Sequence, residues 1–140
     1  MADSDLSRFV TAQDAGGTYP RALAELRAGR KTSHWMWFVF PQLAGLGRSA
    51  TARQYAVSSL DEARAYLDHP VLGERLRECA RVVTETADPP DAVFGGIDAL
   101  KLRSSMTLFA RAAPAESVFA DVLDRHYGGE PDDATDRLLS

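Results

Sequence analysis

The chain has 140 residues, of which 45% are hydrophobic and 26% charged, and its formal net charge at pH 7 is -4. This length and composition fit one ordinary globular domain, and the negative charge argues against a DNA-binding protein. No apolar run reaches the roughly 20 residues of a membrane-spanning helix, the polar N-terminus does not resemble a signal peptide, and the single cysteine, Cys79, allows no internal disulfide. We therefore expect a cytoplasmic protein without a membrane segment.

The spacing of apolar residues predicts helices in the first half of the chain and no convincing strand. The expected helices run from about residue 5 to 14, 19 to 28, 33 to 40, 49 to 56, and 60 to 69. Gly16-Gly17 and Gly29 would separate the first three, and Thr18 would cap the second. Ser59 and Glu62 have the spacing of a capping box at the start of the last one.

The second half of the chain continues the helical pattern. We expect helices from about residue 70 to 86, 97 to 112, 115 to 127 and 132 to 139, with a short turn at 91 to 94. Asp98 is a candidate N-cap, and Cys79 lies in the apolar stripe of the 70 to 86 helix. The sequence therefore predicts an all-α fold, a single multi-helix domain over residues 1–140 with an ordered helical core from about 6 to 139.

One stretch, SHWMWFVFPQ at residues 33–42, is unusually aromatic. Because residues 33 to 40 are apolar on nearly all sides, we expect a central helix capped by Ser33. Aromatic residues and valine also favour strands, but no neighbouring segment resembles a pairing partner. In a helix, His34 and Trp37 would share a face, where an imidazole and an indole could hold a flat ring such as a nucleobase. The alternative is that the run is simply core and that His34 bonds the backbone.

Positive charge is concentrated in two windows. No acid lies between Glu25 and Asp61 or between Asp98 and Glu116, whereas these windows hold eight lysines and arginines. Convergence of the two windows would create an anion site, and chance clustering on solvated faces is the alternative.

Two short segments supply further candidate ligands. Arg48 and Ser49 end the turn LAGLGRS, whose glycines could cradle a phosphate or simply shape a turn between helices. Lys101, Ser104 and Ser105 fall on one helical face in KLRSSMT, where the serines could bind an anion or pack closely. The three histidines are too scattered to predict a metal site, and no carboxylate pair suggests acid–base catalysis.

Three segments resemble the domain-of-unknown-function family 1810: RAGRKTSHWMWFVFPQLAGLGRSATARQYA, SLDEARAYLDHPVLGERLRE and FGGIDALKLRSSMTLF. The resemblance covers about residues 6 to 138 and implies a mainly helical single domain, found in bacteria and some other microbes, without an established reaction. Gly96 and Ile97 stand where Ser and Pro are common in the family. The order of segments is also similar to that of NADAR domains, which are helical N-glycosidases, but that similarity assigns no residue here.

These observations predict a small anionic, nucleotide-like ligand in a polar pocket, with His34 as the catalytic candidate if the protein hydrolyses an N-glycosidic or other bond. The alternative is a non-enzymatic interaction module that docks an acidic protein partner or RNA. No cofactor or metal is implied, and the oligomeric state is not predicted. The residues expected to bind the ligand are Lys31, Trp37, Arg48, Ser49, Lys101, Ser104 and Ser105.

Overall fold

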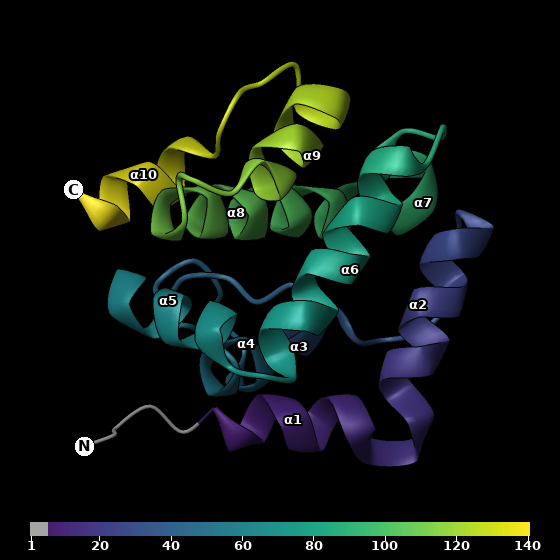
Figure 1. Ribbon diagram of the computed structural model, residues 1–140, viewed down its shortest axis with the longest axis horizontal. Coiled ribbons are helices and arrows are strands. Elements are labelled where there is room, and N and C mark those ends of the chain that lie inside the picture. Colours follow the sequence, from purple (N-terminus) through teal and green to yellow (C-terminus); the bar gives the residue numbers. More distant parts are fainter. Residues whose placement is uncertain (1–5) are drawn as a thin grey trace.

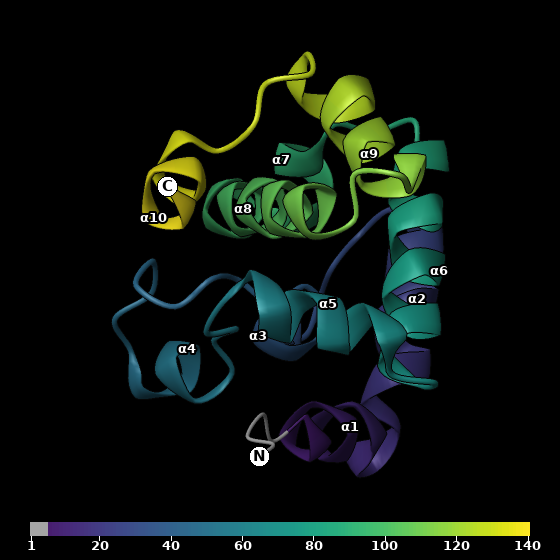
Figure 2. The ribbon, with the colours of Figure 1, turned by 60° about the vertical axis from the view of Figure 1, so that its left-hand side comes forward.

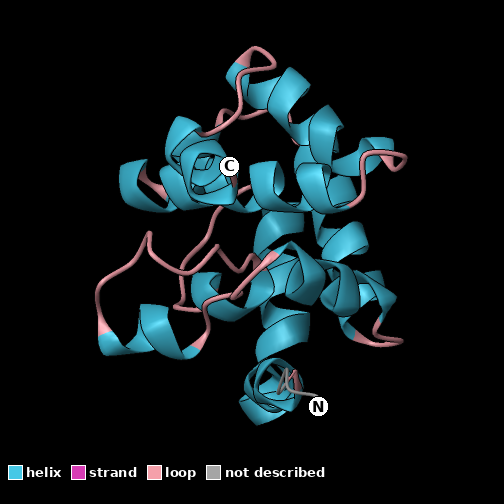
Figure 3. Cartoon of the chain, turned by 90° about the vertical axis from the view of Figure 1, so that its left-hand side faces the viewer, coloured by secondary structure: helices cyan, strands magenta, loops and turns pink. Residues whose placement is uncertain are grey.

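A computed structural model describes residues 6–140, and within that range the chain forms helices and turns without a strand (Figures 1 and 3). Leu43 and Val57 form an isolated parallel bridge outside the helices. The all-α prediction is therefore confirmed. The helices are α1 Ser7–Asp14, the 3-10 turn η1 Ala15–Gly17, α2 Thr18–Ala28, α3 Met36–Val39, α4 Ala50–Gln54, α5 Leu60–Asp68, α6 Leu72–Glu85, α7 Pro90–Phe94, α8 Gly96–Ala112, α9 Ser117–Tyr127 and α10 Asp133–Leu139.

The longest helix, α8, lies between two groups of helices (Figure 2). Helices α9 and α10 pack on one side of it and α5 on the other, while α7 leads directly into its first turn. Helix α6 contacts α2, α5 and α9 and so closes the side of the molecule. Because α8 is covered along most of its length, Leu102, Met106 and Phe109 are completely buried.

Glycines end α1 and α2 at the predicted places. Gly16 and Gly17 have positive φ angles of 59° and 70°, and Gly29 has 75°, a region that disfavours residues with a Cβ atom. The prediction that Thr18 caps α2 was wrong, because Thr18 is the first helical residue and its hydroxyl donates back to the carbonyl of Ala15.

The aromatic run is the largest departure from the expected helices. Helix α3 covers only Met36–Val39, so the predicted helix over 33 to 40 was too long and Ser33 does not cap it. The Ser33 hydroxyl donates instead to Glu25, which also accepts from the backbone N–H of Thr32 and Ser33 and thereby holds this segment in a non-helical form. The core role of the run is confirmed, since Trp35 and Phe40 are almost fully buried.

The apolar stripe of α6 packs as expected. Leu76, Cys79 and Val83 are buried against the neighbouring helices. Burial raises the pKa of the Cys79 thiol to about 12, so the thiol stays protonated at neutral pH, in agreement with an inert core residue.

Candidate functional site

Three of the predicted site residues line one surface cleft. Lys31, His34 and Trp37 come from the segment between α2 and α3 and from α3 itself, and they face the turn between α7 and α8. The cleft has a volume of about 400 Å³, within the roughly 300–1,000 Å³ of small-molecule sites. Its lining residues are Lys31, His34, Met36, Trp37, Phe94, Gly95, Gly96, Ile97 and Asp98.

The two basic windows meet beside this cleft, at the start of α8. Asp98 Oδ2 lies 2.9 Å from Lys31 Nζ, and Asp98 Oδ1 lies 3.6 Å from Lys101 Nζ. The Lys101 ammonium also sits 4.9 Å from the ring centroid of Trp37, which is a cation–π contact. Lys31, Trp37 and Lys101 are thus brought together, with a carboxylate between the two lysines.

Asp98 was predicted as an N-cap, which was wrong. The N-cap of α8 is Gly95, whose φ of 82° and ψ of 162° suit glycine. Because glycine has no side chain, no side-chain hydrogen bond caps this helix. Asp98 instead lies inside the first turn and pairs with the lysine three residues later. That i to i+3 spacing was visible in the sequence and is the signal that could have identified Asp98 as a site residue.

The loop that carries His34 is fixed by Glu25 and Lys31. Trp35 Nε1 donates to Glu25 Oε1 at 2.9 Å, and Lys31 Nζ donates to the Ser33 carbonyl at 2.7 Å. Burial of Glu25 opposes its ionisation, but hydrogen bonds from Ser33, Thr32 and Trp35 outweigh burial and lower the pKa of this carboxyl to about 2. Glu25 is therefore charged, and the loop before α3 is built around that charge.

His34 is exposed at the mouth of the cleft. It precedes α3, so the expected shared helix face with Trp37 was wrong, although both residues line the same cleft. Within residues 6–140 its ring makes no hydrogen bond or ion pair, which leaves both nitrogens available to a ligand.

The serines of α8 lie elsewhere. Ser104 donates to Asp132 Oδ2 at 3.1 Å, where Asp132 caps α10, so this hydroxyl helps to seat α10 on α8. Ser105 is completely buried, and its hydroxyl has no hydrogen-bond partner among the described residues. The expected cluster of Lys101 with both serines is therefore not present at the cleft.

Arg48 and Ser49 are also outside the cleft. Ser49 is the N-cap of α4 and accepts from the backbone N–H of Ala52 at 3.0 Å. Arg48 is exposed on the turn before it. The turn connects α3 to α4, and neither residue lies at the cleft.

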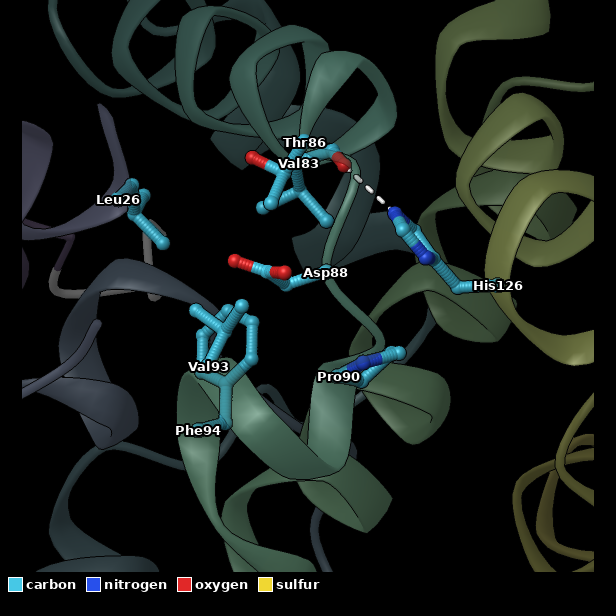
Figure 4. Close-up of a pocket in the computed structure, with 8 residues that line it drawn as sticks. All are labelled: Leu26, Val83, Thr86, Asp88, Pro90, Val93, Phe94 and His126. Atoms are coloured by element: carbon cyan, nitrogen blue, oxygen red, sulfur yellow. Dashed lines mark hydrogen bonds between the residues drawn. The ribbon is translucent and has the colours of Figure 1, made fainter. Parts of the chain in front are cut away.

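A second, much smaller cavity lies between α2, α6, α7 and α9 (Figure 4). Its volume is about 10 Å³, enough for one water molecule at most. His126 reaches its edge and its Nε2 lies 2.7 Å from the Val83 carbonyl, which ties α9 to the end of α6. A cavity of this volume cannot hold a nucleotide-sized ligand.

Two further features are absent from residues 6–140, a group of metal ligands and a membrane-spanning helix. No three His, Cys, Asp or Glu side chains there come close enough to hold a metal ion. Among the described helices, none combines the length and the apolar character needed to cross a membrane.

The fold and the cleft define a small all-α protein with an aromatic-walled surface cleft, braced by a Lys–Asp–Lys cluster. The chain belongs to the family described as protein of unknown function (DUF1810), whose model matches residues 3–139. The structure is similar to the crystal structure of the conserved hypothetical protein Rv1873 from Mycobacterium tuberculosis, with 53% sequence identity, 96% of each chain covered and a TM-score of 0.93. No curated protein matches the chain.

Proposed function

We propose that the cleft binds a small, flat, anionic ligand of nucleotide-like chemistry. The observation that carries the proposal is the contact of the Lys101 ammonium with the Trp37 ring at the edge of an apolar cleft. A ring can pack against the apolar wall while its anionic group reaches the ammonium. The two parts of such a ligand thus match two adjoining parts of the surface.

The apolar wall suits a ring system. Met36, Trp37, Phe94 and Ile97 line the cleft, and Gly95 and Gly96 contribute backbone without side chains. Stacking of a base on an aromatic side chain stabilises a complex by about 1–3 kcal/mol. We expect stacking of the ring to contribute more to the binding free energy than the contact between the anionic group and Lys101.

If the cleft is also catalytic, His34 is the candidate for the catalytic residue. It is exposed in the cleft and could act as a general acid or base on a bound ligand. Asp98 is a carboxylate in the same cleft, but both of its oxygens face lysine ammonium groups. We therefore propose ligand binding as the function and treat N-glycosidic hydrolysis as an outcome to be measured.

The direct test is calorimetric titration with the common ribonucleosides and their monophosphates, together with analysis of the products. Binding by the wild type with at least a tenfold loss in Trp37→Ala is expected from the lost stacking. Arg48→Gln tests the specificity of the cleft, because Arg48 is a predicted ligand residue that lies outside it and its loss should leave binding unchanged. Absence of binding by the wild type at millimolar ligand would refute the proposal. If the wild type releases free base from a nucleotide and His34→Ala does not, the proposed function would include N-glycosidic hydrolysis with His34 as the catalytic residue.

A second candidate function is docking of a protein partner. Ile97 and Leu100 are 73% and 63% exposed on successive turns of α8, beside Lys101 and Arg103. Exposed apolar residues flanked by bases favour a partner with apolar and acidic side chains over RNA. If Ile97→Asp with Leu100→Asp removes an interaction of the protein while nucleotides never bind, docking is the better account.

A further inference from the structure

Asp98 divides its carboxylate between two ammonium groups at the proposed ligand cleft. Its Oδ2 is 2.9 Å from Lys31 Nζ and its Oδ1 is 3.6 Å from Lys101 Nζ. Because Asp98 itself lines the cleft, its negative charge acts on whatever binds there. The three side chains together carry one net positive charge.

Lys31 has little capacity for a ligand. Its side chain is 8% exposed, and besides Asp98 its ammonium donates to the Ser33 carbonyl at 2.7 Å. It also lies 5.1 Å from the ring centroid of Trp35. An ammonium has three N–H donors, so these contacts leave Lys31 as a brace between the loop before α3 and the start of α8.

Lys101 does not line the cleft itself, but it contacts Trp37 and Asp98, which do, and it is the cation offered to a ligand that reaches past these two side chains. Its side chain is 25% exposed, its distance from Asp98 is longer, and within residues 6–140 its ammonium makes no hydrogen bond. One anionic group can therefore find unused donors at Lys101. A second or third anionic group would find Lys31 already occupied and the Asp98 carboxylate close by.

From this arrangement we propose that Asp98 determines specificity by restricting the cleft to ligands with one anionic group and disfavouring polyphosphates. The inference rests on the proposed function, since it names the class of nucleotide-like ligand that the same cleft takes. The Asp98 carboxylate pairs with Lys31, so Lys101 is the one lysine of the cluster that remains for an anionic group of the ligand. Like charges at close range in a partly buried site raise the cost of every added phosphate.

The test compares ribonucleosides, their monophosphates and their triphosphates by titration calorimetry in magnesium-free buffer. We expect the wild type to bind monophosphates more tightly than triphosphates. Asp98→Asn should raise triphosphate affinity about tenfold, with a smaller gain for monophosphates, because a nearby repelling charge is removed. Asp121→Asn, at an exposed position on α9, is the control with the same change in net charge.

The outcomes separate the two proposals. If no nucleotide binds to the wild type or to Asp98→Asn, the proposed function fails. If nucleotides bind but the wild type prefers triphosphates, or if Asp98→Asn changes both affinities by the same factor, the role of Asp98 is overturned while the cleft remains. Should Asp98→Asn fail to fold, the wild type's preference between monophosphates and triphosphates still decides the role of Asp98. Lys101→Gln then tests the anion contact, since it should erase any preference for monophosphates over nucleosides. A preference that survives in Lys101→Gln would refute the assignment of Lys101 as the anion contact.

Discussion

The indole of Trp35 donates a hydrogen bond to Glu25 Oε1 at 2.9 Å, between a fully buried ring and a buried carboxylate. The same carboxylate accepts from the Ser33 hydroxyl at 2.6 Å and from the backbone N–H of Thr32 at 2.8 Å. Glu25 thereby ties the end of α2 to the loop that carries His34. The shape of the candidate site depends on a charge that lies outside it.

Glu25→Gln should destabilise the protein by about 1–3 kcal/mol. A glutamine keeps one acceptor oxygen but places an N–H₂ group where the carboxylate accepted hydrogen bonds, so buried donors lose their partner. Urea unfolding followed by circular dichroism measures the change. Glu85→Gln, at an exposed position near the end of α6, is the matched control. A loss no greater than that of the control would contradict the role of Glu25.

The stabilisation by Glu25 should depend on pH. Its pKa is lowered from 4.5 to about 2, because hydrogen bonds to the charged form outweigh the opposing effect of burial. A carboxyl with a lowered pKa in the folded state contributes stability above its unfolded pKa and loses it as the pH falls through the folded value. The difference in unfolding free energy between wild type and Glu25→Gln should therefore shrink as the pH falls from 5 to 2 and be largely lost at the lower end. Glu116 and Asp136, whose pKa values are lowered by Arg77 and Arg111, are common to both proteins and cancel. A difference that stays constant over this range would argue against the shift.

Much of the fold was predictable because its signals are local. Gly29 adopts the left-handed conformation at the end of α2, and Ser59 accepts from the backbone N–H of Glu62 at the start of α5, as their spacing indicated. Such caps depend on neighbours within one helical turn. The amphipathic stripe of α6 was equally clear, since its period matches the helix.

The aromatic run and the site could be predicted only in part, because they depend on contacts between distant residues. Nothing within one turn of Ser33 reveals that Glu25 will take its hydroxyl and prevent a longer helix. Convergence of the two basic windows was one of two interpretations of the charge pattern, and neither included Asp98, which borders the second acid-free window and pairs with both Lys31 and Lys101. Ser104 shares a face with Lys101, yet α10 covers it, which helical spacing alone cannot show.

Gly73→Ala should destabilise the protein by about 1–3 kcal/mol through overpacking. Gly73 is buried in the first turn of α6, and an added Cβ atom would overlap the Leu67 carbonyl at the end of α5. Alanine ordinarily favours a helix over glycine by up to about 1 kcal/mol, so a loss would show that the close approach dominates. Gly96→Ala, at a helical position with open space around the added atom, is the control and should change stability by less than about 0.5 kcal/mol. Thermal unfolding of both variants measures the two changes in stability. If Gly73→Ala is as stable as the wild type, α5 and α6 can move apart at little cost in free energy.

His69 should contribute about 1 kcal/mol by accepting hydrogen bonds from two backbone N–H groups at the start of α6. Its Nδ1 accepts from the backbone N–H of Val71 at 3.1 Å and of Leu72 at 3.3 Å, which requires a neutral ring with Nδ1 unprotonated. Val71 is the N-cap of α6 and Leu72 its first residue, so neither N–H has a partner within the helix. His69→Ala should lower the free energy of unfolding by that amount and accelerate hydrogen exchange at Leu72. His69→Asn should recover most of the loss, because an asparagine oxygen can accept from the same donors and Pro70 keeps residue 69 extended. Equal losses in the two variants would mean that packing of the ring, and not its acceptor nitrogen, stabilises this corner.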